Sequence, residues 1–261
     1  MLEPSVWAII PVRGGSKSIP CKNLQEVGGV PLIARAIRAC RAADTVRRTI
    51  VSTDDDAIAD IAHKEGAEVV FRPSQISGDE AKSEDALLHT IANFEARKEV
   101  LPEAIAFVQC TSPFVNAADI DGTVRALEKN RCNCAFAAAR QHAFLWRQLS
   151  EGCGVGVNHN AATRLRRQDR DPEFLETGAV YVMQTEGFRA AKHRFFGKIA
   201  IYEMPHVRAI EIDEPDDLKR AQLLAPWLDG DSAIPMRSTH QTKIAAARSL
   251  ISHGKKRFSA G

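Results

Sequence analysis

The stretch with the clearest chemical character is PVRGGSKSIPCKN, residues 11–23. It combines two glycines with the cations Arg13, Lys17 and Lys22, and it directly follows the apolar run VWAII. Glycines let a ligand come close to the backbone and leave its N–H groups free for that ligand. A guanidinium fork and two ammonium groups suit phosphate oxygens. The sequence therefore predicts that this loop holds a di- or triphosphate.

The loop matches neither of two common phosphate-binding motifs. It has no G-x-x-x-x-G-K-S/T, and it has no G-x-G-x-x-G that opens a helix. Pro20 and the polar residues before Pro31 indicate a long loop rather than a tight turn from strand to helix. The competing interpretation is a solvated basic loop whose glycines serve its turns.

A second group of candidate residues is acidic. Glu211 and Asp213 occupy alternate positions near the end of VRAIEI, residues 207–212, which is predicted to be a strand. Alternate strand residues point to one face, so the two carboxylates would lie together. Mg²⁺ prefers oxygen ligands and shares them with phosphate, so we expect a magnesium site here. The alternative is a strand edge that faces solvent.

These groups need a scaffold, and the chain predicts one by alternating strands with helices. Such alternation indicates a parallel sheet with helices on both faces, and ligands bind beyond the carboxyl ends of its strands. Asp54 or Asp55 is expected to cap the second helix and Ser83 the third, while Asp216 and Asp217 suit the first turn of the last. Strands are expected at residues 6–12, 49–53, 68–71, 104–109, 134–139, 179–183, 199–204 and 207–212, and helices at 31–42, 55–65, 83–98, 117–130 and from Pro215 onward.

Composition excludes several classes of protein. The chain has 261 residues and a net charge of +2, and residues 233–261 hold six basic residues and no acid, so the first 232 residues sum to −4. A mildly acidic body is not typical of a general nucleic-acid binder. No apolar run approaches the roughly 20 residues of a membrane helix, and the first residues lack the features of a signal peptide. We therefore expect a cytoplasmic protein with neither nucleic-acid nor membrane partners.

The cysteines and the polar regions complete the expected organisation. The six cysteines form no Cys-x-x-Cys pair, which predicts reduced thiols rather than a zinc site or a disulfide framework. Residues 1–228 are expected to form one domain. Within it, residues 140–177 are predicted to be an insertion of loops and a hairpin. Residues 229–261 are expected to be a loosely ordered basic tail.

The loop sequence R-G-G-S-K-x-x-P-x-K-N resembles the signature of the acylneuraminate cytidylyltransferases, or CMP-sialic acid synthetases. This family activates nine-carbon 2-keto sugar acids with CTP. The resemblance covers roughly residues 6–228, and it implies a Rossmann-like nucleotide-diphospho-sugar transferase fold with a mainly parallel sheet. Five further segments resemble the family in the same order: VSTDDDAIADIAHKEGAEVVFRP, FVQCTSPF, RRQDRDPEFLETGAVYVM, HRFFGK and AIEIDEPDDL.

The resemblance also implies roles for individual residues. Arg13, Lys22 and Asp213 would carry the reaction, with Lys22 stabilising the departing pyrophosphate. Arg167 would hold the carboxylate of the sugar, since a guanidinium binds it with two bonds. The implied CTP contacts are Arg13, Gly14, Ser16, Lys17, Lys22, Asn23, Arg72 and Ser83; the implied sugar contacts are Gln109, Arg167, Gln168, Phe195 and Phe196; the implied metal ligands are Glu211 and Asp213.

Three of these assignments have a plainer alternative. Arg72 could form a salt bridge with Asp54 or Asp79 instead of binding the nucleotide. Arg167 could be one surface charge in an arginine-rich run. Phe195 and Phe196, which the resemblance makes an apolar wall for the N-acyl group, could simply be core residues.

Three residues depart from the pattern of the family. Val115 stands where an arginine is common, Thr177 replaces an asparagine, and Glu211 replaces an aspartate and is one methylene longer. We expect an Mg²⁺-dependent N-acylneuraminate cytidylyltransferase that forms a homodimer, with the insertion building the dimer interface and helping to cover the sugar site. The alternatives are a CMP-legionaminate or CMP-pseudaminate synthetase, a glycosyltransferase on a similar scaffold, and a non-catalytic relative that binds nucleotide.

Overall fold

The structure is a computed structural model, and it describes residues 6–16, 18–78 and 81–230. Lys17, Asp79 and nearly all of the predicted tail lie outside the described residues. The chain divides into two compact units, Met1–Pro226 and Trp227–Gly261. The first unit holds every strand of the described residues and the cavities discussed below.

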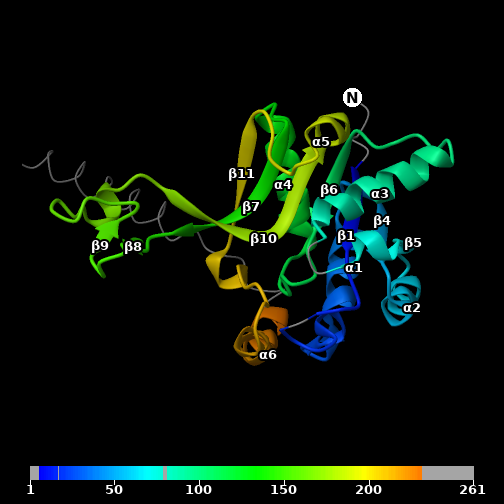
Figure 1. The fold of residues 1–261 in the computed structure, drawn as a ribbon, viewed down its shortest axis with the longest axis horizontal. Helices are drawn as coiled ribbons and strands as arrows, with labels where there is room; N and C mark the ends of the chain where they lie inside the picture. Colours follow the sequence, from blue (N-terminus) through cyan, green and yellow to red (C-terminus); the bar gives the residue numbers. More distant parts are fainter. Residues whose placement is uncertain (1–5, 17, 79–80, 231–261) are drawn as a thin grey trace, which may run out of the picture. The chain divides into compact units, whose positions relative to one another are not determined.

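A seven-stranded sheet forms the centre of the first unit (Figure 1). Strand β10 runs antiparallel to its neighbours β6 and β7, and the other neighbouring strands are parallel. In the order β11-β7-β10-β6-β1-β4-β5, the strands span Ile199–Met204, Cys134–Gln141, Glu173–Gln184, Ala104–Val108, Val6–Pro11, Val46–Thr53 and Glu68–Phe71.

Helices cover both faces of the sheet. The interior strand β1 is buried at every residue from Val6 to Ile10, as expected for a strand packed on two sides. On one face, Trp7 and Ile9 join a core cluster with Leu87, Ile91 and Phe94 of the third helix. The helices are α1 Leu32–Ala42, α2 Asp56–Lys64, α3 Ser83–Ala96, α4 Ala117–Lys129, α5 Thr185–Ala191 and α6 Pro215–Gly230.

The predicted α/β class is confirmed, but the strand predicted at residues 207–212 is wrong. Residues His206–Arg208 form a single 3-10 turn, and the chain is irregular from there to α6. The sheet ends at β11, which pairs only with β7 among the described strands, and residues 207–212 build no ladder with any described strand. Residues 205–214 are called the carboxylate segment below, because they carry Glu211 and Asp213.

The helix starts are partly as predicted. The side chain of Asp55 caps α2 by accepting a bond of 3.0 Å from the N–H of Ile58. Ser83 does not cap α3. Lys82 occupies the N-cap position, and its carbonyl accepts a hydrogen bond from the N–H of Asp85. Ser83 is therefore the first residue of the helix.

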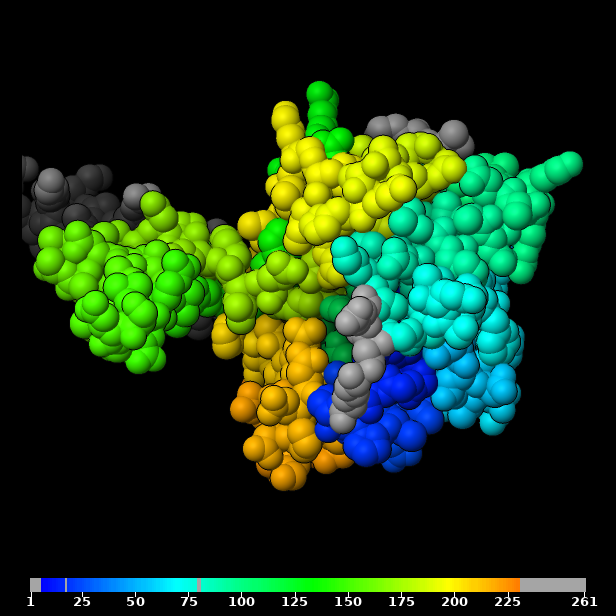
Figure 2. All heavy atoms as spheres, in the orientation of Figure 1, coloured from blue at the N-terminus to red at the C-terminus, as the bar shows by residue number. Residues whose placement is uncertain are grey.

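The insertion forms an arm, residues 142–172, between β7 and β10. Those strands remain paired up to Gln141 and Glu173, and the arm then leaves the sheet (Figures 1 and 2). Its hairpin consists of β8 Trp146–Gln148 and β9 Gly154–Gly156, which confirms the predicted hairpin. A second short pair, β2 Glu26–Val27 and β3 Val30–Pro31, precedes α1. Among the described helices, none has the length and apolar character required to span a membrane.

Candidate active site

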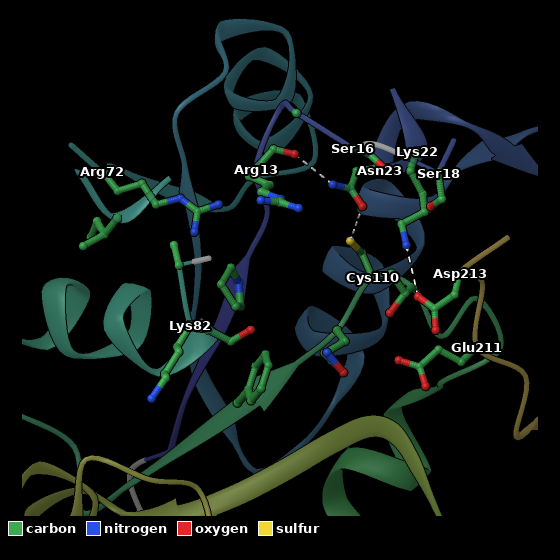
Figure 3. A pocket seen from close by; sticks show the side chains of 18 residues that line it. Arg13, Ser16, Ser18, Lys22, Asn23, Arg72, Lys82, Cys110, Glu211 and Asp213 are labelled. Carbon is green, nitrogen blue, oxygen red and sulfur yellow. Dashed lines mark hydrogen bonds and ion pairs between the residues drawn. The ribbon is translucent and has the colours of Figure 1, made fainter. Parts of the chain in front are cut away.

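A cavity of about 420 Å³ lies at the carboxyl ends of β1 and β6, where the sequence predicted a ligand site (Figure 3). Four separate stretches of the chain form its walls. They are the loop after β1, the connection from β5 to α3, the end of β6 and the carboxylate segment. The lining residues are Pro11, Arg13, Gly15, Ser16, Ser18, Lys22, Asn23, Arg72, Ile76, Ala81, Lys82, Ser83, Phe107, Gln109, Cys110, Thr111, Glu211 and Asp213.

The loop after β1, residues 12–23, is called the phosphate loop, and its described residues are held close to the sheet. The N–H of Gly14 donates to Oδ1 of Asp54 over 3.1 Å. A Cβ atom on Gly14 would lie 2.4 Å from the carboxylate of Asp55, so this position requires glycine for close approach. The amide of Asn23 donates to the carbonyl of Arg13 over 3.0 Å and thereby closes the loop.

Lys22 connects the phosphate loop to the carboxylates. Its Nζ donates to the carbonyl of Ile212 over 2.9 Å and lies 3.2 Å from Oδ1 of Asp213 (Figure 3). Its side chain is only 14% exposed. The ammonium group is therefore held where phosphate oxygens from the loop side and carboxylate oxygens from the opposite side would meet.

Arg72 fits both of its predicted interpretations. It is buried, and its Nη2 lies 4.0 Å from Oδ1 of Asp54, a long ion pair. Burial lowers the pKa of its guanidinium; Asp54 opposes that shift and Arg13 adds to it. Nε of Arg72 is buried without a hydrogen-bond partner. Because buried donors are nearly always paired, an acceptor on a ligand is a natural partner for this group.

Ser83 and Gln109 line the same cavity from other elements. Ser83 is the first residue of α3. Gln109 follows β6, and its N–H donates to the carbonyl of Ala179 over 3.1 Å, which holds it against β10. The structure thus brings both predicted ligand contacts to the site even though Ser83 is not a cap.

Glu211 and Asp213 also face this cavity, although they lie on no strand. Glu211 is accessible from the cavity, yet partial desolvation raises the pKa of its carboxyl, and the nearby Asp213 raises it further. A carboxylate whose charge is disfavoured by a neighbouring carboxylate forms with it a donor set that a divalent cation would stabilise. The described residues contain no cluster of three or more His, Cys, Asp or Glu ligands.

A second cavity, of about 360 Å³, shares Lys82 with the first. Phe195 lines it, as a wall of a sugar site would. Phe196 instead packs on Gly187, where a Cβ would lie 2.3 Å from its ring, and contacts the core cluster. Phe195 contacts the same core cluster, so the core interpretation holds for both residues, and Phe195 alone of the pair also lines this cavity.

Sequence reasoning missed an arginine in this second cavity. Nε of Arg194 donates to Glu84 over 2.7 Å, and its guanidinium lies over the rings of Phe107 and Tyr181. The hydroxyl of Tyr181 donates to Glu176. The pKa of this hydroxyl is raised, first by burial and then by the hydrogen bond to Glu176. The only signal in the sequence was that Arg194 directly precedes the two phenylalanines.

Arg167 and Gln168 are not brought to either cavity. Both are exposed, in the 3-10 turn Arg167–Asp169 of the arm. The departures Val115 and Thr177 are buried. The hydroxyl of Thr177 donates to the carbonyl of Ala137 over 2.7 Å, so it binds the neighbouring strand.

The family model of the cytidylyltransferases matches residues 7–245. The chain belongs to this family. It is 35% identical over 210 residues to N-acylneuraminate cytidylyltransferase B of Danio rerio, an alignment that covers 79% of this chain and 48% of that protein. It is 28% identical over 214 residues to an N-acylneuraminate cytidylyltransferase of Streptococcus agalactiae, covering 80% and 50%. The chain thus spans about half the length of these curated relatives.

Solved structures of two cytidylyltransferases share the fold. One is a CMP:2-keto-3-deoxy-manno-octonic acid synthetase complexed with CTP, with a TM-score of 0.64 and 15% identity over 85% of this chain and 99% of that chain. The other is a 4-diphosphocytidyl-2C-methyl-D-erythritol synthase from Anaerococcus prevotii, with a TM-score of 0.60 and 14% identity over 85% and 96%. The predicted family and fold are confirmed.

Proposed function

We propose that this cytidylyltransferase transfers the cytidylyl group of CTP to a nonulosonic acid. The oxygen of the anomeric 2-hydroxyl forms a bond to the α-phosphorus of CTP. The bond from that phosphorus to the bridging oxygen of the β-phosphate breaks, and pyrophosphate leaves with its electron pair. The hydroxyl proton is released to solvent, and CMP-sugar is the product.

The observation that carries this proposal is the position of Lys22. One ammonium group joins the phosphate loop to Ile212 and Asp213, so both walls meet at one point of one cavity. Arg13 and Lys22 would neutralise the phosphates, and Lys22 would stabilise the departing pyrophosphate. Phosphoryl-type transfer depends on such alignment and charge neutralisation.

The other residues of the site would bind and orient the substrates. Arg72 and Ser83 would contact the nucleotide. The amide of Gln109 can both donate to and accept from sugar hydroxyls. Glu211 and Asp213 would hold Mg²⁺, which supplies charge neutralisation at the phosphates when it is bound.

Family membership favours nucleotidyl transfer over the two alternatives outside the family's chemistry. A glycosyltransferase would bind a finished nucleotide-sugar, whereas a loop with Arg13 and Lys22 suits a free triphosphate. A non-catalytic relative would have no need for Gln109, Glu211 and Asp213 in one cavity with those cations. The names of the similar proteins favour N-acylneuraminate as the acceptor. Legionaminate and pseudaminate remain the competing acceptors.

The arm supports a proposed homodimer. It exposes an unusual number of large apolar side chains, which a second copy of the chain would remove from water. Arg167 and Gln168 would then reach the sugar site of the other copy. The exposed apolar residues of the arm are Leu145, Trp146, Leu149, Val155, Val157 and Leu165.

Mixing two inactive variants tests this arrangement. Lys22→Ala and Arg167→Ala would each be inactive alone. Random exchange into symmetric dimers would restore about a quarter of wild-type activity if Arg167 acts in the partner's site. Light scattering would give the mass of the assembly. A monomer, or no recovery on mixing, would contradict the proposal.

Pyrophosphate release tests the reaction itself. CTP and Mg²⁺ would be supplied with one nonulosonic acid at a time, and ATP, GTP and UTP would serve as controls. We expect release with CTP and N-acetylneuraminate. Binding of CTP without release with any acid would support the non-catalytic relative, and absence of CTP binding would overturn the role of the phosphate loop.

A further inference from the structure

The carboxylate segment obtains its position without a sheet. A strand is placed by the ladder of hydrogen bonds to its neighbours. Residues 205–214 lie between β11 and α6 and contain only one 3-10 turn. Glu211 and Asp213 therefore depend on a few individual contacts for their place in the cavity.

The downstream half of the segment has several anchors. The N–H of Ile212 donates to the carbonyl of Thr111 over 2.8 Å, and its carbonyl accepts from Lys22 over 2.9 Å. The side chain of Ile212 is fully buried. The N–H of Asp213 donates to Oδ2 of Asp217 over 3.2 Å. These contacts hold Asp213 independently of what precedes it.

The upstream half is held by an ion pair between the partly buried Arg208 and a fully buried carboxylate. Nη2 of Arg208 lies 2.7 Å from Oδ1 of Asp119, which is fully buried in the first turn of α4. The other oxygen of Asp119 accepts from the N–H of Asn116 over 3.1 Å and completes a capping box. Burial raises the pKa of the Asp119 carboxyl, and Arg208 opposes that rise. A buried charge that loses its partner is strongly unfavourable, so the pair is held together.

These contacts join the same two stretches of chain at two points. Arg208 and Ile212 are the attachment points on the carboxylate segment, and both bind within residues 111–119. Glu211 lies between the two attachments. Loss of the upstream attachment would free the backbone that leads into Glu211, whereas Asp213 would keep its downstream bonds.

We propose that Asp119 and Arg208 are positioning residues whose ion pair holds Glu211 at the distance from Asp213 that a divalent cation shared with the CTP phosphates requires. Neither residue lines the cavity, so both act through the segment. The inference rests on the proposed function for the nucleotide and the cation, and it is independent of the identity of the sugar.

The test separates positioning from stability by a double substitution. Arg208→Met alone leaves Asp119 buried without its cation and is expected to lower the melting temperature. The variant D119N/R208M removes that charge, and the amide oxygen that it introduces can still accept from the N–H of Asn116. Replacing a buried ion pair by neutral groups is often neutral for stability. The double variant is therefore expected to regain most of the thermal stability of the wild type.

A matched control comes from the same helix. Asp121 is also buried on α4, but its carboxylate accepts from the N–H groups of Thr45 and Asp44, over 2.9 and 3.2 Å, and makes no bond to the described residues of the carboxylate segment. Asp121→Asn is expected to lower stability without affecting the carboxylates.

Two readouts decide the test. One is the affinity for Mn²⁺ in the presence of CTP, measured by electron paramagnetic resonance. The other is the Mg²⁺ concentration that gives half-maximal pyrophosphate release. Loss of a residue that orients a metal ligand commonly weakens binding by about 10- to 100-fold. We expect D119N/R208M to raise both the Kd for Mn²⁺ and the required Mg²⁺ concentration by about tenfold. Asp121→Asn is expected to leave both values at those of the wild type.

The inference would be overturned if a stable D119N/R208M variant bound Mn²⁺ with the same Kd as the wild type. It would also be overturned if Asp121→Asn raised that Kd as much as the double substitution does. If the double variant does not fold, Arg208→Met decides at a temperature below its melting point, since it removes the bond from Arg208 to Asp119; unchanged Mn²⁺ binding by folded Arg208→Met would then overturn the inference. A wild type that binds Mn²⁺ with CTP but releases no pyrophosphate contradicts only the proposed function. If the double variant turns over and requires the same Mg²⁺ concentration as the wild type, only the positioning role of Asp119 and Arg208 is contradicted.

Discussion

The two walls of the candidate active site are built in different ways. The phosphate loop continues directly from β1, a buried interior strand, and it bonds to itself and to neighbouring strand ends, such as Gly14 to Asp54. It also reaches farther, through Arg13 to the carbonyl of Gly78 and through Lys22 to the carboxylate segment. The carboxylate segment is attached through Lys22 and through Thr111 and Asp119, which come from two distant parts of the chain. Changes in the loop should therefore alter nucleotide binding, whereas changes in the segment should alter metal dependence and turnover.

Lys22→Met should have the largest effect because Lys22 belongs to both walls. It removes the charge that would stabilise pyrophosphate and the bonds to Ile212 and Asp213. We expect kcat to fall by about 10²- to 10³-fold, as for other groups that stabilise developing charge. Pyrophosphate release measures it, with Lys219→Met as the control because Lys219 is exposed and pairs only with Asp216 among the described contacts. A fall in kcat of less than tenfold would contradict the role of Lys22 in stabilising the departing pyrophosphate.

Gly178→Ala should act on the carboxylate segment alone. Gly178 has φ +68°, and a Cβ there would lie 2.7 Å from Oε1 of Glu211. Gly29 has φ +73°, and no atom lies near its Cβ position, so Gly29→Ala is the matched control. Both substitutions should cost about 1–2 kcal/mol of stability because alanine is strained in this region. Only Gly178→Ala should also lower kcat, by about 10- to 100-fold, because displaced groups lose alignment. Equal activity of the two variants would argue against a role for Glu211.

Gly14→Ala should act on the phosphate loop alone. A Cβ on Gly14 would collide with Asp55, whereas no atom lies within 4 Å of a Cβ on Gly15. We expect Gly14→Ala to raise the Kd for CTP by about tenfold, which is about 1.4 kcal/mol, and Gly15→Ala to change it little. Calorimetric titration with CTP measures both. If Gly14→Ala raised the required Mg²⁺ concentration without weakening CTP binding, the assignment of nucleotide binding to the phosphate loop and of metal binding to the carboxylate segment would be contradicted.

The smallest expected effect is a pH dependence of stability that comes from Glu211. Its carboxyl has a pKa above the usual value in the folded chain, first because of desolvation and then because of Asp213. Ionisation therefore opposes folding, so this contribution is fully present at low pH and is lost as the pH rises through the raised pKa. Glu211→Gln should match the wild type at low pH and exceed its stability above that range, measured by denaturant titration in EDTA. A difference that stays constant with pH would contradict this assignment.

Much of the site could be predicted because its signals are local. Arg13 and Lys22 were predicted from glycines and cations that follow an apolar run, Asn23 was predicted from the resemblance to the family, and all three line the cavity. Gln109 was recognised from its place at the end of a strand. Glu211 and Asp213 also reach the cavity, although the strand that was meant to place them does not exist. The alternation of their side chains indicated a strand, but a strand forms only where a neighbour completes its hydrogen bonds.

Other assignments depended on contacts that no local pattern reports. Phe195 and Phe196 both pack against the core cluster, yet only Phe195 of the two also lines the second cavity. Arg167 lies exposed on the arm. Arg194 pairs with Glu84, 110 residues away in the sequence, and was not recognised beforehand.

By itself, the sequence determined the alternation of strands and helices, the phosphate loop at the end of β1 and the residue types of the site. These follow from hydrophobic periodicity and from residues that act within a few positions of each other. Only the tertiary structure decided how the carboxylate segment is held, because Arg208 meets Asp119 and Lys22 meets Ile212 across 89 and 190 residues of chain. Such pairs form only after the sheet has brought the ends of its strands together, and each buried charge is then stable only with its partner in place.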